Sequence, residues 1–140
     1  MTNQINELLT NSNLSELGIE IALPIEEYVA KIYENSTIIP YVMQSSLKGF
    51  ISYYNNDPTK TNAFLTMLFV SDQHQGKGIG RLLLQTSIAD LKRNGFLNYS
   101  LEVLKTNEKA IQLYMKYGFK IKEDRGNIWL MNMDLNSLNL

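Results

Sequence analysis

The chain has 140 residues, of which 44% are hydrophobic and 19% are charged, a composition typical of one globular domain rather than of a disordered segment. Thirteen basic and fourteen acidic side chains give a net charge of −1, which disfavours nucleic-acid binding through bulk electrostatics. The absence of cysteine excludes disulfides and a thiol nucleophile, and a single histidine, His74, disfavours a metal site. We therefore expect one cytoplasmic domain over residues 1–140, with no metal and no membrane contact.

The first half of the chain predicts two helices followed by three strands. Apolar side chains at helical spacing indicate helices over 3–17 and 25–33, the second beginning after Pro24. Runs rich in β-branched and aromatic residues indicate strands, expected at 38–43, 50–54 and 63–70. We expect Ser45–Gly49 to form the turn of the first hairpin, and the last strand, apolar on both faces, to lie in the centre of a sheet.

The second half alternates helices and strands. The helices are expected at 78–94 and 107–117, each followed by a glycine that can end it, and the strands at 99–104, 119–123 and 128–135. Two helices, three strands and then a helix–strand–helix–hairpin series predict an α/β fold with a mixed sheet.

The sharpest local feature is the segment Gln75–Arg81, which reads QGKGIGR and joins a buried strand to a helix. Glycines allow the backbone to turn tightly and to approach a ligand, and backbone amides at a helix N-terminus attract anions. A diphosphate is the ligand that this arrangement favours. The segment fits neither the P-loop pattern, because Gly80 is followed by Arg81-Leu82, nor a dinucleotide fingerprint, because Arg81 or Leu83 stands at the final small position.

A second block lies downstream, on the predicted strand and helix after the glycine loop. It is composed of Leu101-Glu102-Val103, Asn107, Ala110, Tyr114 and Gly118-Phe119. Together with Gln75–Gly80, which fits the Q/R-x-x-G-x-G/A acetyl-CoA loop, this block resembles the GCN5-related N-acetyltransferase (GNAT) superfamily. The resemblance extends from about Ala63 to Phe119, and the first forty residues carry no usable match.

The resemblance implies a sheet whose two central strands splay apart, flanked by helices, with acetyl-CoA as the cosubstrate in the gap. Asn107 would bond the pantetheine arm, and as an asparagine it is also a good helix N-cap. Lys77 either adds charge beside the diphosphate or is a solvated loop lysine. The residues implied in acetyl-CoA binding are Leu68, Phe69, Val70, Gln75, Gly76, Lys77, Gly78, Ile79, Gly80, Arg81, Asn107 and Tyr114.

Two residues are candidates for the chemistry. Tyr114 stands where the superfamily carries its general acid, and an ordinary tyrosine pKa of about 10 keeps it protonated at pH 7. Glu102 stands where the ribosomal-protein N-terminal acetyltransferases carry a base. The alternatives to a catalytic role are that Glu102 only holds the substrate or that it forms a structural pair. A base matters because an amine of pKa about 10.4 is mostly protonated at pH 7. We expect His74 to be an exposed loop residue.

The resemblance implies an acetyl-CoA-dependent N-acetyltransferase acting on a primary amine of a small molecule, such as an amino sugar, a polyamine or a drug-like amine. A protein N-terminal or lysine acetyltransferase is an alternative, which the short turn Asp124–Asn127 disfavours because it lacks tyrosines. A second alternative is a non-catalytic regulatory module that binds acyl-CoA. The presence of Tyr114 disfavours it. We expect no nucleic-acid partner, and either a monomer or a homodimer.

Overall fold

A computed structural model describes residues 1–136 of the chain. The helices are α1 (Thr2–Thr10), α2 (Ile25–Asn35), α3 (Ile79–Arg93) and α4 (Glu108–Lys116). The strands are β1 (Thr37–Met43), β2 (Ser46–Tyr54), β3 (Asn62–Val70), β4 (Asn98–Leu104), β5 (Lys120–Asp124) and β6 (Ile128–Asp134). Among the described residues, no helix is long and apolar enough to cross a membrane.

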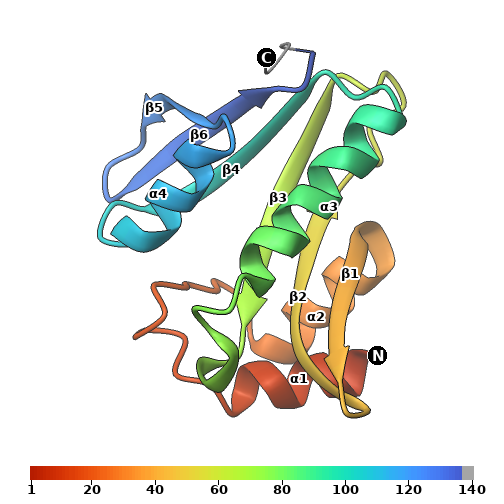
Figure 1. Cartoon of the computed structure of the whole chain (residues 1–140), viewed down its shortest axis with the longest axis vertical. Coiled ribbons are helices and arrows are strands. Elements are labelled where there is room, and N and C mark those ends of the chain that lie inside the picture. Colours follow the sequence, from red (N-terminus) through yellow and green to blue (C-terminus); the bar gives the residue numbers. More distant parts are fainter. Residues whose placement is uncertain (137–140) are drawn as a thin grey trace.

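The six strands form one mixed sheet in the order β1-β2-β3-β4-β6-β5, in which only β3 and β4 are parallel neighbours. The pairing of β3 with β4 runs from Asn62–Asn98 to Leu65–Leu101 and ends there. Beyond that point the two strands diverge, and the sheet opens into a V (Figure 1). The mixed α/β fold and the splayed central strands predicted from the sequence are confirmed.

A β-bulge marks the position where β3 leaves β4. Ser52 pairs with Met67 and the next residue, Tyr53, pairs with Leu65, so Thr66 is an extra residue in β3. A bulge bends its strand and increases the local twist. The Thr66 hydroxyl lies 2.5 Å from the Ser52 hydroxyl and donates to the Ser52 carbonyl oxygen at 3.2 Å, so the bulged residue is fastened to β2 rather than to β4.

Two hydrophobic clusters cover the two faces of the sheet. The cluster under α1 and α2 includes Ile5, Leu9, Val29, Ile32, Phe50 and Phe69. The other packs α3 and α4 against the sheet and contains a chain of four aromatic rings, whose centroids are 6.1, 5.4 and 5.7 Å apart in the order Tyr53, Tyr99, Phe119 and Tyr114. These rings connect β2 and β4 to α4 through the second hydrophobic cluster. Figure 1 shows α3 and α4 on the same face of the sheet.

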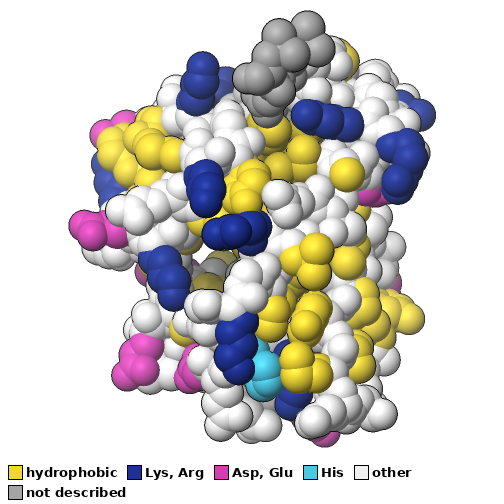
Figure 2. All heavy atoms as spheres, viewed as in Figure 1, with side chains coloured by type: hydrophobic (Ala, Val, Ile, Leu, Met, Phe, Trp, Pro, Cys, Tyr) yellow, Lys and Arg dark blue, Asp and Glu magenta, His cyan; other side chains and the backbone are white. Residues whose placement is uncertain are grey.

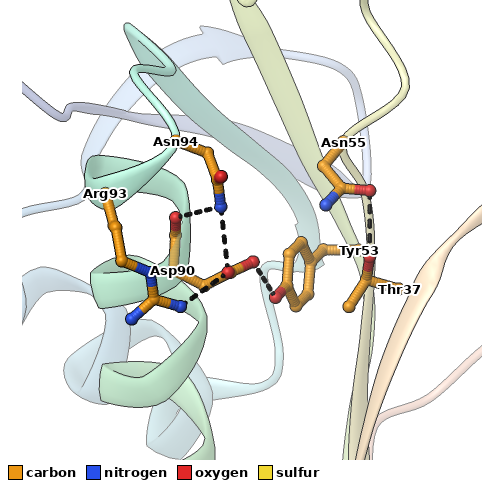
Figure 3. Close-up of polar contacts among 6 residues, drawn as sticks. All are labelled: Thr37, Tyr53, Asn55, Asp90, Arg93 and Asn94. Carbon is orange, nitrogen blue, oxygen red and sulfur yellow. Dashed lines mark hydrogen bonds and ion pairs between the residues drawn. The ribbon is translucent and has the colours of Figure 1, made fainter.

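A polar network fixes the C-terminal end of α3 to β2 (Figure 3). The hydroxyl of Tyr53, whose side chain is otherwise buried, donates to Asp90 Oδ2 at 2.6 Å. Arg93 and Asn94 donate to Asp90 Oδ1, both at 3.0 Å. Burial and the neighbouring Asp90 carboxylate raise the pKa of Tyr53, so its proton stays on the phenol and keeps donating.

Two predicted boundaries in the first half of the chain are wrong. The first helix ends at Thr10 rather than at residue 17, because Asn11 caps it and the Ser12 hydroxyl donates to the Leu8 carbonyl oxygen at 2.7 Å. The first hairpin turns at Gln44 and Ser45 alone, both with positive φ, so residues 46–49 belong to β2. Gly49 serves close packing rather than the turn, since a Cβ there would lie 2.6 Å from the Phe69 carbonyl oxygen.

Candidate functional site

A cleft of about 910 Å³ occupies the gap between the separated ends of β3 and β4. Its walls come from the segment after α1, the second half of β3, the glycine loop, the end of β4 and one side of α4. Figure 2 shows the face that carries α3 and α4, where a hollow opens with Lys and Arg side chains around its rim. Every sequence-predicted site residue except Lys77 lines this cleft.

The glycine loop presents backbone rather than side chains. Gly76 and Gly78 have φ of 76° and 81°, a left-handed conformation that residues with a Cβ rarely adopt. No heavy atom lies within 4 Å of the position that a Cβ would take at either glycine. Gly78 is also the N-cap of α3, so the unpaired amides of the first helical turn follow directly. With Arg81 in the same wall, the loop fits an anion such as a diphosphate.

Side chains around the loop hold it in place. Gln75 Nε2 donates to the Val70 carbonyl oxygen at 3.0 Å, which closes the loop onto the end of β3. His74 Nδ1 lies 2.8 Å from the Ser71 hydroxyl, and the ring is half-buried and lines the cleft, so the expectation of an exposed His74 is wrong. Partial desolvation, with the charges of Lys48 and Lys77, lowers the pKa of His74.

Of the three residues at the end of β3, Leu68 and Val70 are half-buried at the gap, next to α3. The third, Phe69, directs its ring into the opposite cluster, where it stacks on Phe50 with a centroid distance of 6.1 Å. Ile79, the first residue of α3, is 5% exposed and belongs to the core beneath the loop. The apolar wall of the cleft therefore comes from side chains that also anchor β3 and α3.

Asn107 connects α4 to the segment after α1. Its Oδ1 accepts a hydrogen bond from the Ala110 amide at 3.3 Å and so caps α4. Its Nδ2 donates to the Leu17 carbonyl oxygen at 3.5 Å, and the side chain packs directly against Gly18. The asparagine is thus a cap, as expected from its type, and also the contact that joins two walls of the cleft.

Tyr114 is 7% exposed and lies in the inner wall of the cleft, with its ring against Phe119. Its hydroxyl makes no hydrogen bond with any residue of the described part of the chain. Burial raises the pKa of this phenol, so the hydroxyl keeps its proton over the physiological pH range. Tyr114 therefore offers the cleft a protonated hydroxyl that no neighbour uses.

Glu102 lies near the end of β4, and its side chain is 39% exposed. One carboxylate oxygen, Oε2, is 3.1 Å from Arg125 Nη1, in the turn between β5 and β6. Glu102 lines the cleft, whereas Arg125 does not. The carboxylate is therefore able to meet a ligand in the cleft while one of its oxygens is paired from outside.

Several charged residues of the cleft were not predicted from the sequence. Glu16 and Glu20 line it from the segment after α1, and Lys109 and Lys116 line it from α4. The wrongly extended first helix concealed Glu16, because a helix over 3–17 does not indicate a cleft wall, and no local pattern marked Glu20. No group of three or more His, Cys, Asp or Glu side chains suited to a metal ion occurs among residues 1–136.

Comparison with known proteins agrees with this geometry. Residues 5–119 match the acetyltransferase (GNAT) family. The spermine/spermidine N(1)-acetyltransferase of Bacillus subtilis (strain 168) is 29% identical over 83 residues, which are 55% of this chain and 55% of that protein. The chain thus matches about half the length of this curated relative.

Solved structures share the fold over nearly the whole chain. The PaiA N-acetyltransferase of Thermoplasma acidophilum, crystallised with coenzyme A, has a TM-score of 0.76 at 22% identity, covering 95% of this chain and 92% of that one. PH1933 of Pyrococcus horikoshii OT3 has a TM-score of 0.82 at 24% identity, covering 97% of this chain and 91% of that one. With the family match over residues 5–119, these findings make the chain a member of the acetyltransferase (GNAT) family.

Proposed function

We propose that the protein is an acetyl-CoA-dependent N-acetyltransferase whose acceptor is a primary amine of a small molecule. The observation that carries the proposal is the cleft itself, which brings the glycine loop, Asn107, Tyr114 and Glu102 to one gap between two splayed strands. Family membership supports the activity, and the coenzyme A complex of the Thermoplasma relative supports the cosubstrate.

The residues present fit acetyl-CoA, which when bound would supply an acetyl thioester. The amides of Gly76–Arg81 and the N-terminus of α3 would hold its diphosphate, with the Arg81 guanidinium adding positive charge. Asn107 and the end of β3 would hold the pantetheine arm through amide and backbone groups. Lys77 does not line the cleft, so we assign it no role other than adding positive charge near the loop.

Two proton-handling groups line the cleft, Glu102 on β4 and Tyr114 on α4. Glu102 would take the proton of the acceptor ammonium, directly or through water, with the carboxylate oxygen that Arg125 leaves free. Tyr114 would give its phenolic proton, or a hydrogen bond, to the leaving sulfur, because no other described residue engages its hydroxyl. Such an arrangement removes a proton on one side of the reaction and supplies one on the other.

The cleft contains carboxylates that an ammonium acceptor could bind. Glu16, Glu20 and Glu102 line it alongside Arg81, Lys109 and Lys116, and carboxylates form charge-assisted hydrogen bonds with ammonium groups. The name of the Bacillus relative, a spermine/spermidine N(1)-acetyltransferase, supports a polyamine among the small amines.

The proposal is tested by following coenzyme A release from acetyl-CoA with a panel of polyamines, amino sugars and short peptides. We expect release with at least one small primary amine, and calorimetric binding of acetyl-CoA without any acceptor. Binding of acetyl-CoA with no transfer to any amine would instead support the non-catalytic acyl-CoA-binding module.

A further inference from the structure

The turn between β5 and β6 places an arginine against the carboxylate of Glu102. Arg125 Nη1 is 3.1 Å from Glu102 Oε2, and its Nη2 is 3.3 Å from Glu123 Oε2. One guanidinium thus bridges carboxylates from β4 and β5. Of the three residues only Glu102 lines the cleft, so the bridge reaches the cleft from behind its wall.

The backbone of this turn is held without the guanidinium. The Arg125 amide donates to the Ile128 carbonyl oxygen at 3.0 Å, and the Gly126 amide donates to Asp124 Oδ1 at 3.1 Å. Lys105 adds a bond from its amide to the Asn127 carbonyl oxygen at 3.0 Å and an ion pair with Asp124 at 2.6 Å. Loss of the Arg125 side chain should therefore leave the turn in place.

Both ion pairs of Arg125 can exchange partners easily. The side chains of Arg125, Glu102 and Glu123 are 41%, 39% and 55% exposed, and exposed ion pairs contribute little to stability. An ammonium group that enters the cleft can replace the guanidinium at Glu102, while Arg125 keeps its contact with Glu123. The guanidinium also repels any cation that approaches Glu102, and this repulsion grows with the charge of the cation.

We propose that Arg125 is a specificity-determining residue, which competes with the acceptor ammonium for the Glu102 carboxylate and so limits the affinity for multiply charged amines. The inference rests on the proposed function, because it assumes an amine acceptor at Glu102. It assigns opposite effects to the two partners outside the cleft: Arg125 weakens amine binding, and Glu123 strengthens it by drawing the guanidinium away from Glu102.

The test compares two neutralising variants, Arg125→Gln and Glu123→Gln, in the coenzyme A-loaded protein, where no acetyl group is present to react. Calorimetry measures binding of 1,4-diaminobutane and of butylamine, which differ by one positive charge. For Arg125→Gln we expect the diamine to bind about two- to fivefold more tightly, the range of an exposed ion pair, and butylamine to gain less. For Glu123→Gln we expect weaker binding of the diamine.

Three controls distinguish charge competition from a structural role. Arg125→Lys keeps the charge and should bind the diamine about as the wild type does. The double variant Arg125→Gln/Glu123→Gln should bind it like Arg125→Gln alone, since Glu123 acts only through Arg125. Thermal melting shows whether each variant is folded.

Changes in the same direction for Arg125→Gln and Glu123→Gln, or no change in either, would overturn the inference while leaving the proposed function intact. An Arg125→Lys variant that behaves like Arg125→Gln would overturn it too, because geometry rather than charge would then matter. A wild-type protein that binds coenzyme A but neither binds nor acetylates any amine would overturn both proposals.

Discussion

Gly18 and Asn107 touch across the cleft so closely that a side chain on Gly18 would displace Asn107. A Cβ on Gly18 would lie 2.7 Å from Asn107 Nδ2 and 2.9 Å from Asn107 Cγ. Gly18 also has a φ of 73°, which glycine adopts without strain. The segment that follows α1 is therefore fastened to the N-terminus of α4 through the side chain that we assign to the pantetheine arm.

We expect Gly18→Ala to weaken acetyl-CoA binding, because the added methyl group displaces Asn107. Gly95→Ala is the matched control, since Gly95 has a φ of 84° and no heavy atom within 4 Å of its Cβ position. Both variants should lose about 1–2 kcal/mol of unfolding free energy from left-handed backbone strain. Only Gly18→Ala should lose affinity by calorimetry, and equal affinities in the two variants would contradict the role of Asn107.

Sequence patterns predicted the elements that carry a strong periodic or local signal. The apolar run of β3, the glycine after α3 and the capping asparagine before α4 each indicate their element without reference to the rest of the chain. The GNAT resemblance supplied the splay between β3 and β4. No local pattern shows where a parallel pair of strands stops, because that depends on the bulge at Thr66 and its partner strand.

The missed features depend on tertiary contacts or on unusual backbone. The hairpin turn at Gln44 and Ser45 carries none of the Asn-Gly or Gly-containing pairs that usually mark positive φ. The Glu102–Arg125 pair joins β4 to a distant turn, and neither residue stands in a motif with the other. Residues 15–17, predicted as helix, line the cleft because the first helix ends early, at Thr10.

The glycines of the loop should respond differently to alanine. Gly78 has a φ of 81°, so Gly78→Ala should cost about 1–2 kcal/mol of unfolding free energy. Gly80 lies inside α3 without positive φ, and its Cβ would meet Val70 Cγ2 at 3.8 Å and Leu68 Cδ2 at 4.0 Å, both ordinary contacts. Gly80→Ala should therefore raise stability by about 0.5–1 kcal/mol, the helix preference of alanine over glycine.

A larger side chain at the same position, as in Gly80→Leu, should weaken acetyl-CoA binding, because it extends past Val70 and Leu68 in the cleft wall. We expect a loss of about tenfold, within the 1–3 kcal/mol that overpacking costs in a packed site. Chemical denaturation and calorimetry on Gly80→Ala and Gly80→Leu separate the effect on stability from the effect on binding. A folded Gly80→Leu protein with unchanged affinity would remove the glycine loop from the acetyl-CoA site.

Glu102→Gln should lower turnover with an amine acceptor by about a hundred- to ten-thousandfold at neutral pH, the usual contribution of a general base. The deficit should shrink as pH rises, because more of the amine is then neutral without help. At saturating acceptor, Glu123→Gln is the control for charge alone, because it removes a carboxylate behind the cleft wall and its expected effect is on amine binding. Full activity of Glu102→Gln at pH 7 would show that Glu102 is not the base and only forms the ion pair with Arg125.

The stability of the protein should depend on pH partly through His74. Its pKa is lowered in the folded state, so the folded protein favours the neutral ring. This contribution is complete above the unfolded pKa of about 6.5 and is lost as pH falls through the lowered value. We expect the melting temperature to fall less in His74→Gln than in the wild type between pH 7.5 and 5. If the melting temperatures of the two proteins fall equally with pH, protonation of His74 is not coupled to stability.

Tyr114→Phe removes one hydroxyl and keeps the ring that packs on Phe119. The folded state should be nearly unchanged, because no described residue bonds the hydroxyl. Acetyl-CoA affinity should also change little, since the hydroxyl matters mainly when charge develops on the leaving sulfur. The chemical step should slow by about ten- to a thousandfold, the range for a lost proton donor or charge-stabilising group.

Single-turnover kinetics on Tyr114→Phe measure that step without product release. Tyr117→Phe is the matched control, because Tyr117 is the half-buried C-cap of the same helix and lies outside the cleft. It should keep the wild-type rate. The raised pKa of Tyr114 adds a second readout: the hydroxyl keeps its proton well above pH 8, so the Phe variant should be slower by a constant factor from pH 6 to pH 8. An unchanged chemical step in the folded Phe variant would reduce Tyr114 to a packing residue and leave departure of the thiol to solvent.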